Sequence, residues 1–135
     1  MEIQSFEFAG AGLARVYENE KWMVGIKNWK PANDISGIDC LERHNETDEL
    51  FVLVAGSCIL LSATEKAGGG LDIKANVMMP LKVYNIPRSL WHNTVTVKGT
   101  KLILIEDSST GASNSDVLPL DADQIAAVKK LTGNR

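Results

Sequence analysis

The segment ERHNETDELFVLVAG, residues 42–56, changes from acidic and polar to apolar within a few positions. It opens with Glu42 and His44, and Glu49 stands directly before an uninterrupted apolar run. The chain has 2 histidines, and the second, His92, lies in IPRSLWHNTVTV, residues 86–97. If the two imidazoles meet in the folded protein, they form a site. If they do not, His44 is a polar residue in a loop.

Alternation along three short segments predicts that these groups face the same interior. Successive side chains of a strand point to opposite sides, so Glu42 and His44 share one face while Glu49 and His92 each lead a face of their own strand. In every case the potential ligand lies near a strand end, and mostly apolar or small polar residues follow on the same face. The segments are residues 38–44, 49–56 and 91–97.

The rest of the chain reads as further short strands separated by turns. Hydrophobic residues make up 44% and aromatic residues only 6%, and a Val-, Ile- and Leu-rich composition of this kind is typical of a β-rich core. Eight or so strands with little helix predict an all-β sandwich or barrel. The polar segment DSSTGASNSD, residues 107–116, is predicted to be an exposed connector. Additional strands are predicted in residues 15–29 (two, divided at ENE), 71–79, 82–87 and 101–107.

One helix is predicted, near the C-terminus. Asp121 followed by Gln124 is a capping-box pattern, and apolar residues then recur at helical spacing over about 122–132. A length of 135 residues favours one domain, residues 1–135, with a barrel core over about 15–107.

Charge and cysteine usage exclude several classes. A net charge of −3 without blocks of like charge gives no basic surface for nucleic acid or an anionic membrane. Cys40 and Cys58 are flanked by apolar residues and form no CxxC, which favours two reduced thiols over a disulfide. The acidic start MEIQSFEFAG is no signal peptide, and the longest apolar run is shorter than the ~20 residues of a membrane helix. A cytoplasmic protein is expected.

The two histidine-bearing segments together resemble the cupins. The first cupin motif is Gly, five residues, His-x-His, three or four residues, Glu, six residues, Gly. Here His44, Glu49 and Gly56 fit the pattern, while Glu42 stands where the first His belongs and Gly37 is one residue closer than the pattern asks.

The second cupin motif is Gly, five residues, Pro-x-Gly, two residues, His, three residues, Asn. Pro87 and His92 match it in register, whereas Leu81, Ser89 and Thr96 replace its two glycines and its asparagine. The resemblance covers residues 37–106 and implies a cupin-type double-stranded β-helix, a jelly-roll barrel, here with a short C-terminal α-helix.

Cupins typically hold a divalent metal through two or three His and one Glu. The resemblance therefore implies His44, Glu49 and His92 as ligands, with Glu42 as a fourth ligand or a general base. Imidazole suits Zn, Ni and Fe, and carboxylate shifts the preference toward Mn, so the identity of the metal stays open. Ion pairs among the same groups would be the metal-free alternative.

Five other residues are candidates for a substrate pocket, although packing or solvation would equally account for several of them. They are Lys27, Tyr84, Trp91, Thr94 and Thr96.

The expected function is metal-assisted chemistry on a small polar metabolite, a sugar or an organic acid, of the isomerase, epimerase or dioxygenase type. The alternative is a metal-free module that binds or senses a small molecule. Residues 50–54 are apolar on both faces, so the outer face of this strand needs a cover. The N-terminal strand, the last helix or a second subunit could supply it, and the resemblance implies a homodimer.

Overall fold

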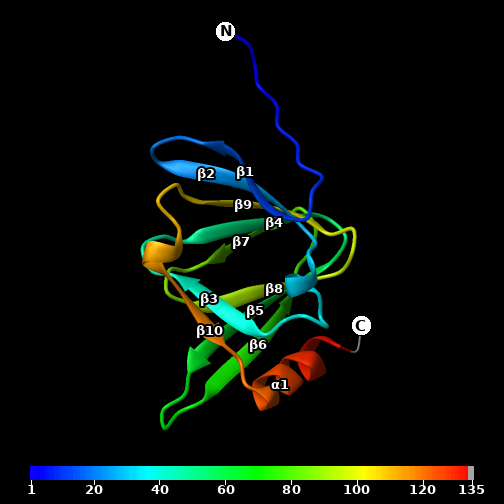
Figure 1. Ribbon diagram of the computed structural model, residues 1–135, viewed down its shortest axis with the longest axis vertical. Coiled ribbons are helices and arrows are strands. Elements are labelled where there is room, and N and C mark those ends of the chain that lie inside the picture. Colours follow the sequence, from blue (N-terminus) through cyan, green and yellow to red (C-terminus); the bar gives the residue numbers. More distant parts are fainter. Residues whose placement is uncertain (134–135) are drawn as a thin grey trace.

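Two five-stranded antiparallel sheets face each other (Figure 1). The computed structural model describes residues 1–133, so the last two residues of the predicted domain, 134 and 135, lie outside the described part. Sheet A contains, in spatial order, β1 (Gly12–Glu18), β2 (Trp22–Asn28), β9 (Lys101–Asp107), β4 (Glu49–Ala55) and β7 (Val83–Ile86). Sheet B contains β10 (Ser115–Pro119), β3 (Cys40–His44), β8 (Trp91–Thr96), β5 (Cys58–Glu65) and β6 (Leu71–Val77). The predicted all-β jelly-roll barrel is confirmed.

Strand β10 is the element that the sequence does not predict. The expected connector over residues 107–116 ends too late, because Ser115 and Asp116 already belong to β10 and pair with His44 and Arg43 of β3. The connector itself contains a short 3-10 turn, η2 (Ala112–Asn114). Because the polar start of β10 carries no alternating apolar signal, its strand conformation follows from pairing with β3.

Alternate residues of both sheets fill the space between them. Met23, Phe51, Leu60, Leu102 and Leu104 are buried in this inner core. Burying one such side chain stabilises the fold by about 1.5–3 kcal/mol. The inner core occupies much of the barrel, and the polar cluster described below lies at one end of it.

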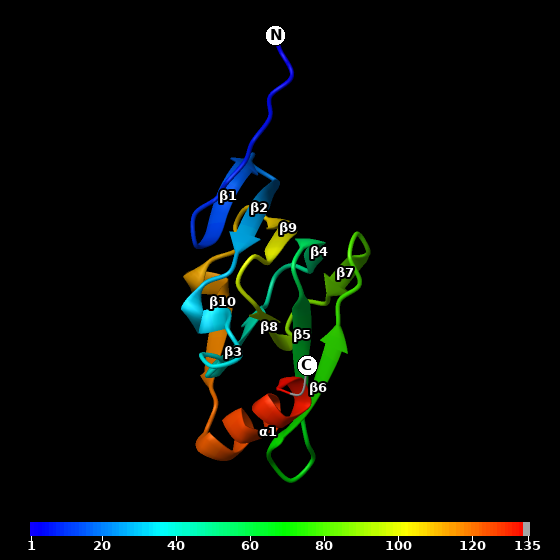
Figure 2. The same ribbon diagram turned by 90° about the vertical axis from the view of Figure 1, so that its right-hand side faces the viewer.

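The C-terminal helix covers the outer face of sheet B. Helix α1 (Ala122–Thr132) begins after Asp121, whose carboxylate accepts the Gln124 backbone N–H at 2.8 Å, so the predicted capping box forms. Helix α1 lies beside sheet B (Figure 2), and its Val128 packs with Leu61 and Trp91 in a second core, separate from the core between the sheets. No helix within residues 1–133 is long and apolar enough to cross a membrane.

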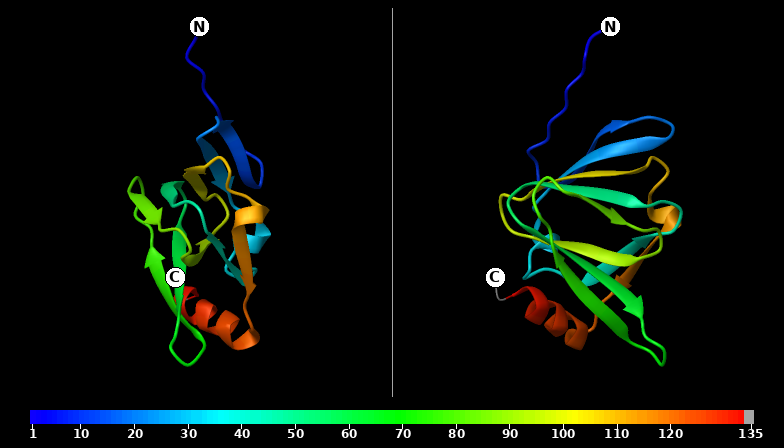
Figure 3. Two further views of the ribbon diagram at one scale, coloured as in Figure 1. Left: turned by 90° about the vertical axis from the view of Figure 1, so that its left-hand side faces the viewer. Right: turned by 180° about the vertical axis from the view of Figure 1, so that it is seen from behind.

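The outer face of β4 is not covered by α1, because that helix lies on the other sheet. Strand β1 does not cover it either, since β1 extends sheet A by pairing edge to edge with β2. Of the segment before β1, Phe8 and Gly10 accept hydrogen bonds from side chains of β2 and β9, and the chain before them extends away from both sheets (Figure 3). The homodimer therefore stays a prediction.

Two turns keep the backbone that the cupin motif assigns to glycine. Leu81 and Ser89, which replace the two motif glycines, both have φ of 67°, in the left-handed region that side chains rarely adopt. Gly56 has φ of 77°, and a Cβ there would lie 2.6 Å from Thr100 Cα. The Ser89 N–H donates to the His44 carbonyl at 2.7 Å, which ties this turn to the end of β3. The motif substitutions thus retain the shape of the turns.

Candidate metal centre

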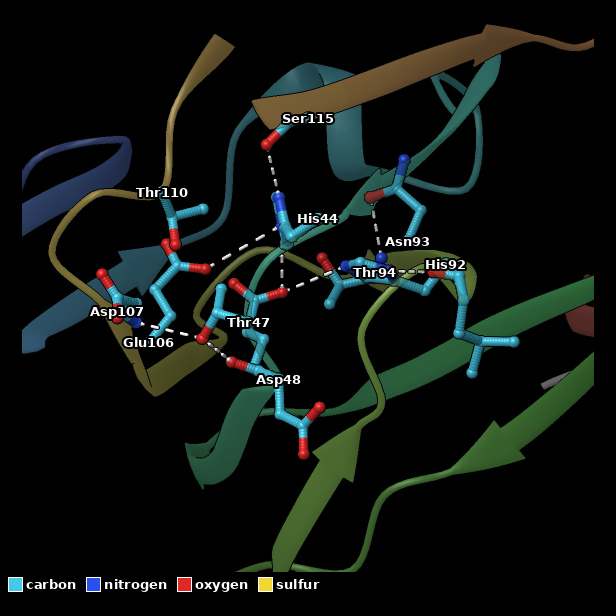
Figure 4. A network of polar contacts seen from close by, with 12 residues as sticks. His44, Thr47, Asp48, His92, Asn93, Thr94, Glu106, Asp107, Thr110 and Ser115 are labelled. Carbon is cyan, nitrogen blue, oxygen red and sulfur yellow. Dashed lines mark hydrogen bonds and ion pairs between the residues drawn. The ribbon is translucent and has the colours of Figure 1, made fainter. Parts of the chain in front are cut away.

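The two histidines and Glu49 meet at one end of the barrel. His44 ends β3, Glu49 begins β4, and His92 is the second residue of β8. Glu49 Oε1 lies 3.0 Å from His92 Nε2 and 3.4 Å from His44 Nε2. The ring centroids of His44 and His92, both labelled in Figure 4, are 5.3 Å apart. The Nε2 atoms of both imidazoles therefore face one carboxylate oxygen, Oε1 of Glu49.

The orientation of His92 is set by the backbone. Its Nδ1 lies 2.8 Å from the Leu90 carbonyl oxygen, which can only accept, so the Nδ1 proton points there. Nε2 is then the nitrogen presented to Glu49. A hydrogen bond from one ring nitrogen to a carbonyl is how proteins commonly orient a metal-binding histidine.

His44 is oriented by a residue that the sequence does not reveal. Its Nδ1 lies 2.8 Å from Ser115 Oγ on β10 (Figure 4), whereas Nε2 is the ring nitrogen that lies near Glu49. Because β10 is not predicted, no sequence signal connects Ser115 to His44. The hydroxyl oxygen can accept a hydrogen bond from Nδ1–H, which leaves Nε2 of His44 facing Glu49.

Glu42 also lies next to the cluster formed by His44, Glu49 and His92. It pairs with His92 across β3 and β8, and Glu42, His44 and His92 each offer a ligand atom within 4.8 Å of the others. Its side chain is half-buried. The structure therefore brings together all four residues implied by the resemblance.

A fifth ligand-type residue, Glu106 of β9, is missed by the sequence analysis. Its Oε2 lies 3.9 Å from His44 Nε2, and Glu106, His44 and Glu49 form a second group with ligand atoms within 4.8 Å of one another. A signal for it does exist in KLILIED, residues 101–107, because Leu102, Leu104 and Glu106 alternate onto the inner face.

The pKa values of Glu49 and Glu106 are shifted in opposite directions. Burial opposes ionisation of Glu49, yet hydrogen bonds from His44 and His92 outweigh it and lower the pKa of Glu49. Burial, reinforced by the charge of Glu49, raises the pKa of Glu106 to about 8. The hydrogen bond to Glu49 raises the pKa of His44 against the opposing effect of burial.

Three of the five predicted pocket residues, Trp91, Thr94 and Thr96, make packing or hydrogen-bond contacts that stabilise the fold. Trp91 packs in the second core, and the guanidinium carbon of Arg43 lies 4.3 Å from the centroid of its ring. Thr96 Oγ1 donates to the Asn33 carbonyl at 3.3 Å, and the Asn33 side-chain amide contacts Thr94 Oγ1 at 3.4 Å. Both threonines thus hold the turn η1 (Pro31–Asn33) against β8.

The other two pocket residues lie on the inner side of sheet A. Tyr84 packs on the inner core and lines a cavity of about 230 Å³ together with Ser62 and Leu90, the cross-strand and near-chain neighbours of His92. Lys27 pairs with the inward residue Leu102. Burial lowers the pKa of Lys27, while the charges of Glu42 and Glu49 act in the opposite direction.

The residues present fit a divalent metal ion. Two oriented imidazoles and several carboxylates converge, and the buried Glu106 Oε2 has no hydrogen-bond partner within the described chain. A buried carboxylate oxygen without a partner is costly unless a proton or a cation is supplied. The donor set is of the kind that Mn, Fe and Zn use.

Comparisons with known proteins identify the fold. No protein-family model matches the chain, and no curated protein does. A cupin-2 domain protein from Shewanella frigidimarina matches with a TM-score of 0.51 and 15% identity over 74% of this chain and 84% of its own. Streptomyces PAC13, solved with uridine, reaches 0.60 with 7% identity over 91% and 96%. Oxalate decarboxylase from Bacillus subtilis gives 0.51 with 19% identity over 72% of this chain but only 24% of its own. At these identities the likeness shows the fold alone.

Proposed function

On this cupin fold, we propose that the protein is an enzyme that uses a divalent metal ion, held by His44, Glu49 and His92, to transform a small polar metabolite such as a sugar or an organic acid. One observation carries the proposal: Nε2 atoms of two histidines from different strands face one oxygen of a buried glutamate. Each of these rings has its other nitrogen engaged outside the cluster.

The chemistry that we propose is proton transfer of the isomerase or epimerase type. A bound divalent ion would act as a Lewis acid on a substrate oxygen. Glu42 is half-buried beside both imidazoles, so it can take or return a proton at a carbon next to that oxygen. Glu106, a further carboxylate beside His44, would occupy a position that the two-His, one-carboxylate sites of oxygen-activating iron enzymes leave open, which disfavours the dioxygenase type.

The size and polarity of a neighbouring cavity support this substrate class. The cavity of about 230 Å³ beside Leu90 is lined by both apolar and polar side chains, including Tyr84, Ser62 and Asn76. We propose that Tyr84 contacts the substrate there and that the Lys27 ammonium attracts an anionic group. The names of two structural neighbours are in keeping with such substrates, since one is an oxalate decarboxylase and the other was solved with uridine.

A metal-free binding module is the second candidate. Glu49 Oε1 forms a hydrogen bond with His92 Nε2 at 3.0 Å and lies 3.4 Å from His44 Nε2, so with both imidazoles protonated on both nitrogens the three groups would satisfy one another without a cation. In that function the polar end of the barrel would recognise its ligand by hydrogen bonds alone.

A thermal-shift panel of sugars, sugar acids and small organic acids separates the two functions. Protein reconstituted with Mn²⁺ and protein treated with chelator are compared side by side. We expect a rise of the melting temperature by a few degrees only with Mn²⁺ present, because binding to the native state stabilises it. Stabilisation of equal size in chelator would favour the binding module and contradict the enzyme.

A further inference from the structure

We infer that Glu106 is the fourth protein ligand of the metal and takes over the part of the missing motif histidine, while Glu42 is left free for the substrate. The inference rests on the proposed function, and it assigns the ligand that the sequence motif does not name. It starts from the pairing of two strands in sheet A.

The register of sheet A sets two carboxylates opposite each other. Leu50 pairs with Ile105 and Phe51 with Leu104, so the same register continued by one residue places Glu49 opposite Glu106. Like charges directly opposite on neighbouring strands repel each other. The two side chains also lie on the same inward face, next to His44.

Burial makes this repulsion costly unless a proton or a cation is supplied. Glu49 is only 4% exposed and Glu106 only 8%. Within residues 1–133, their ion pairs are with imidazoles and with no Lys or Arg side chain. Glu106 Oε2 lies close to His44 Nε2 without hydrogen bonding to it or to any other described atom. A divalent ion between these groups would engage that oxygen and relieve both charges.

Glu42 does not make the same demand. Its side chain is half-buried and lies on sheet B, on the opposite side of the cluster from Glu49 and Glu106. Water can therefore solvate its charge without an ion. Assigning the ligand role to Glu106 leaves Glu42, which is less buried than Glu49 and Glu106, free to meet a substrate.

The assignment has a consequence for metal choice. A set of two imidazoles and two carboxylates carries one more anionic oxygen donor than the usual three-histidine, one-glutamate set. Additional carboxylate shifts the preference toward harder ions such as Mn²⁺ relative to Zn²⁺. Glu106 would then be the residue that determines which metal the protein selects.

Calorimetric titration of the metal-free full chain with Mn²⁺ and with Zn²⁺ tests the assignment. Glu106→Gln keeps size and polarity but removes the anionic donor, and we expect it to weaken Mn²⁺ binding by at least tenfold in Kd, roughly the smallest loss seen for residues that support a metal. Glu42→Gln is expected to stay within about threefold of the wild type. Glu65→Gln, an exposed acid at the end of β5, is the matched control for loss of one charge.

A second variant guards against misfolding of the first. Glu106→His restores a donor of the softer type, and we expect it to bind metal while shifting the Mn²⁺-to-Zn²⁺ ratio of Kd values toward Zn²⁺ by about tenfold or more. An unchanged ratio in this variant, or wild-type Mn²⁺ affinity in Glu106→Gln, would overturn the assignment alone. A loss confined to Glu42→Gln would transfer the role to Glu42. Absence of binding by the wild-type chain would overturn the proposed function as well.

Discussion

Joint replacement of His44 and His92 by alanine is expected to reduce the bound metal from about one ion per chain to less than about a tenth of that, after reconstitution and removal of excess ion. The two Nε2 atoms are the nitrogen donors of the cluster, and without them only carboxylates remain. Two of the protein ligands are then gone, and the remaining carboxylates provide too few donors to hold the ion when excess metal is removed. Metal content is measured by elemental analysis on protein purified without a histidine tag.

Ser115→Ala is the control variant for the loss of bound metal, and a smaller effect is expected from it. It keeps both imidazoles and removes only the hydroxyl that lies 2.8 Å from His44 Nδ1. We expect about a tenfold weaker affinity and a retained stoichiometry, as is usual when an outer partner of a metal-binding histidine is lost. Full metal content in the double histidine variant would show that any bound ion lies elsewhere.

Raising the pH from 6 to 8 in chelator is expected to reduce the free energy of unfolding of the metal-free protein by about 2 kcal/mol. Burial raises the pKa of Glu106 to about 8, so the native state keeps a proton that the unfolded chain has already released above its ordinary pKa. The stability that this proton contributes is present at lower pH and is lost as the pH rises toward 8. The raised pKa of His44 acts in the same direction.

The opposite sign applies on the acid side. The pKa of Glu49 is lowered by hydrogen bonds that outweigh burial, so its contribution is present above its ordinary pKa and is lost as the pH falls further. Urea unfolding in chelator at several pH values measures the free energy of unfolding on both the acidic and the alkaline side of the pH profile. Glu106→Gln should flatten the limb between pH 6 and 8, and a wild-type stability that rises over this range would contradict the burial of Glu106 as an acid.

Much of the cluster could be predicted from local sequence, because strand alternation assigns faces without knowledge of the partners. The same rule would have found Glu106, which follows Leu102 and Leu104 on one face. It would also have excluded Trp91 from the face of its neighbour His92.

Other features depend on contacts between distant segments. Ser115 belongs to a strand because it pairs with β3, some seventy residues away in the sequence, and the residues adjacent to it in the sequence do not predict a strand. The left-handed backbone at Leu81 and Ser89 is likewise held by the surrounding structure, since neither residue prefers it. Such features follow from the fold as a whole and not from the pattern of a single strand.

Anomalous diffraction from crystals grown with Mn²⁺ and measured at the manganese absorption edge tests most directly whether the histidines and Glu49 form a metal centre. We expect one strong peak within about 2.5 Å of His44 Nε2, His92 Nε2 and a Glu49 oxygen, the range usual for such ligands. Crystals in which both imidazoles are ordered and no anomalous peak lies between them would contradict the metal centre.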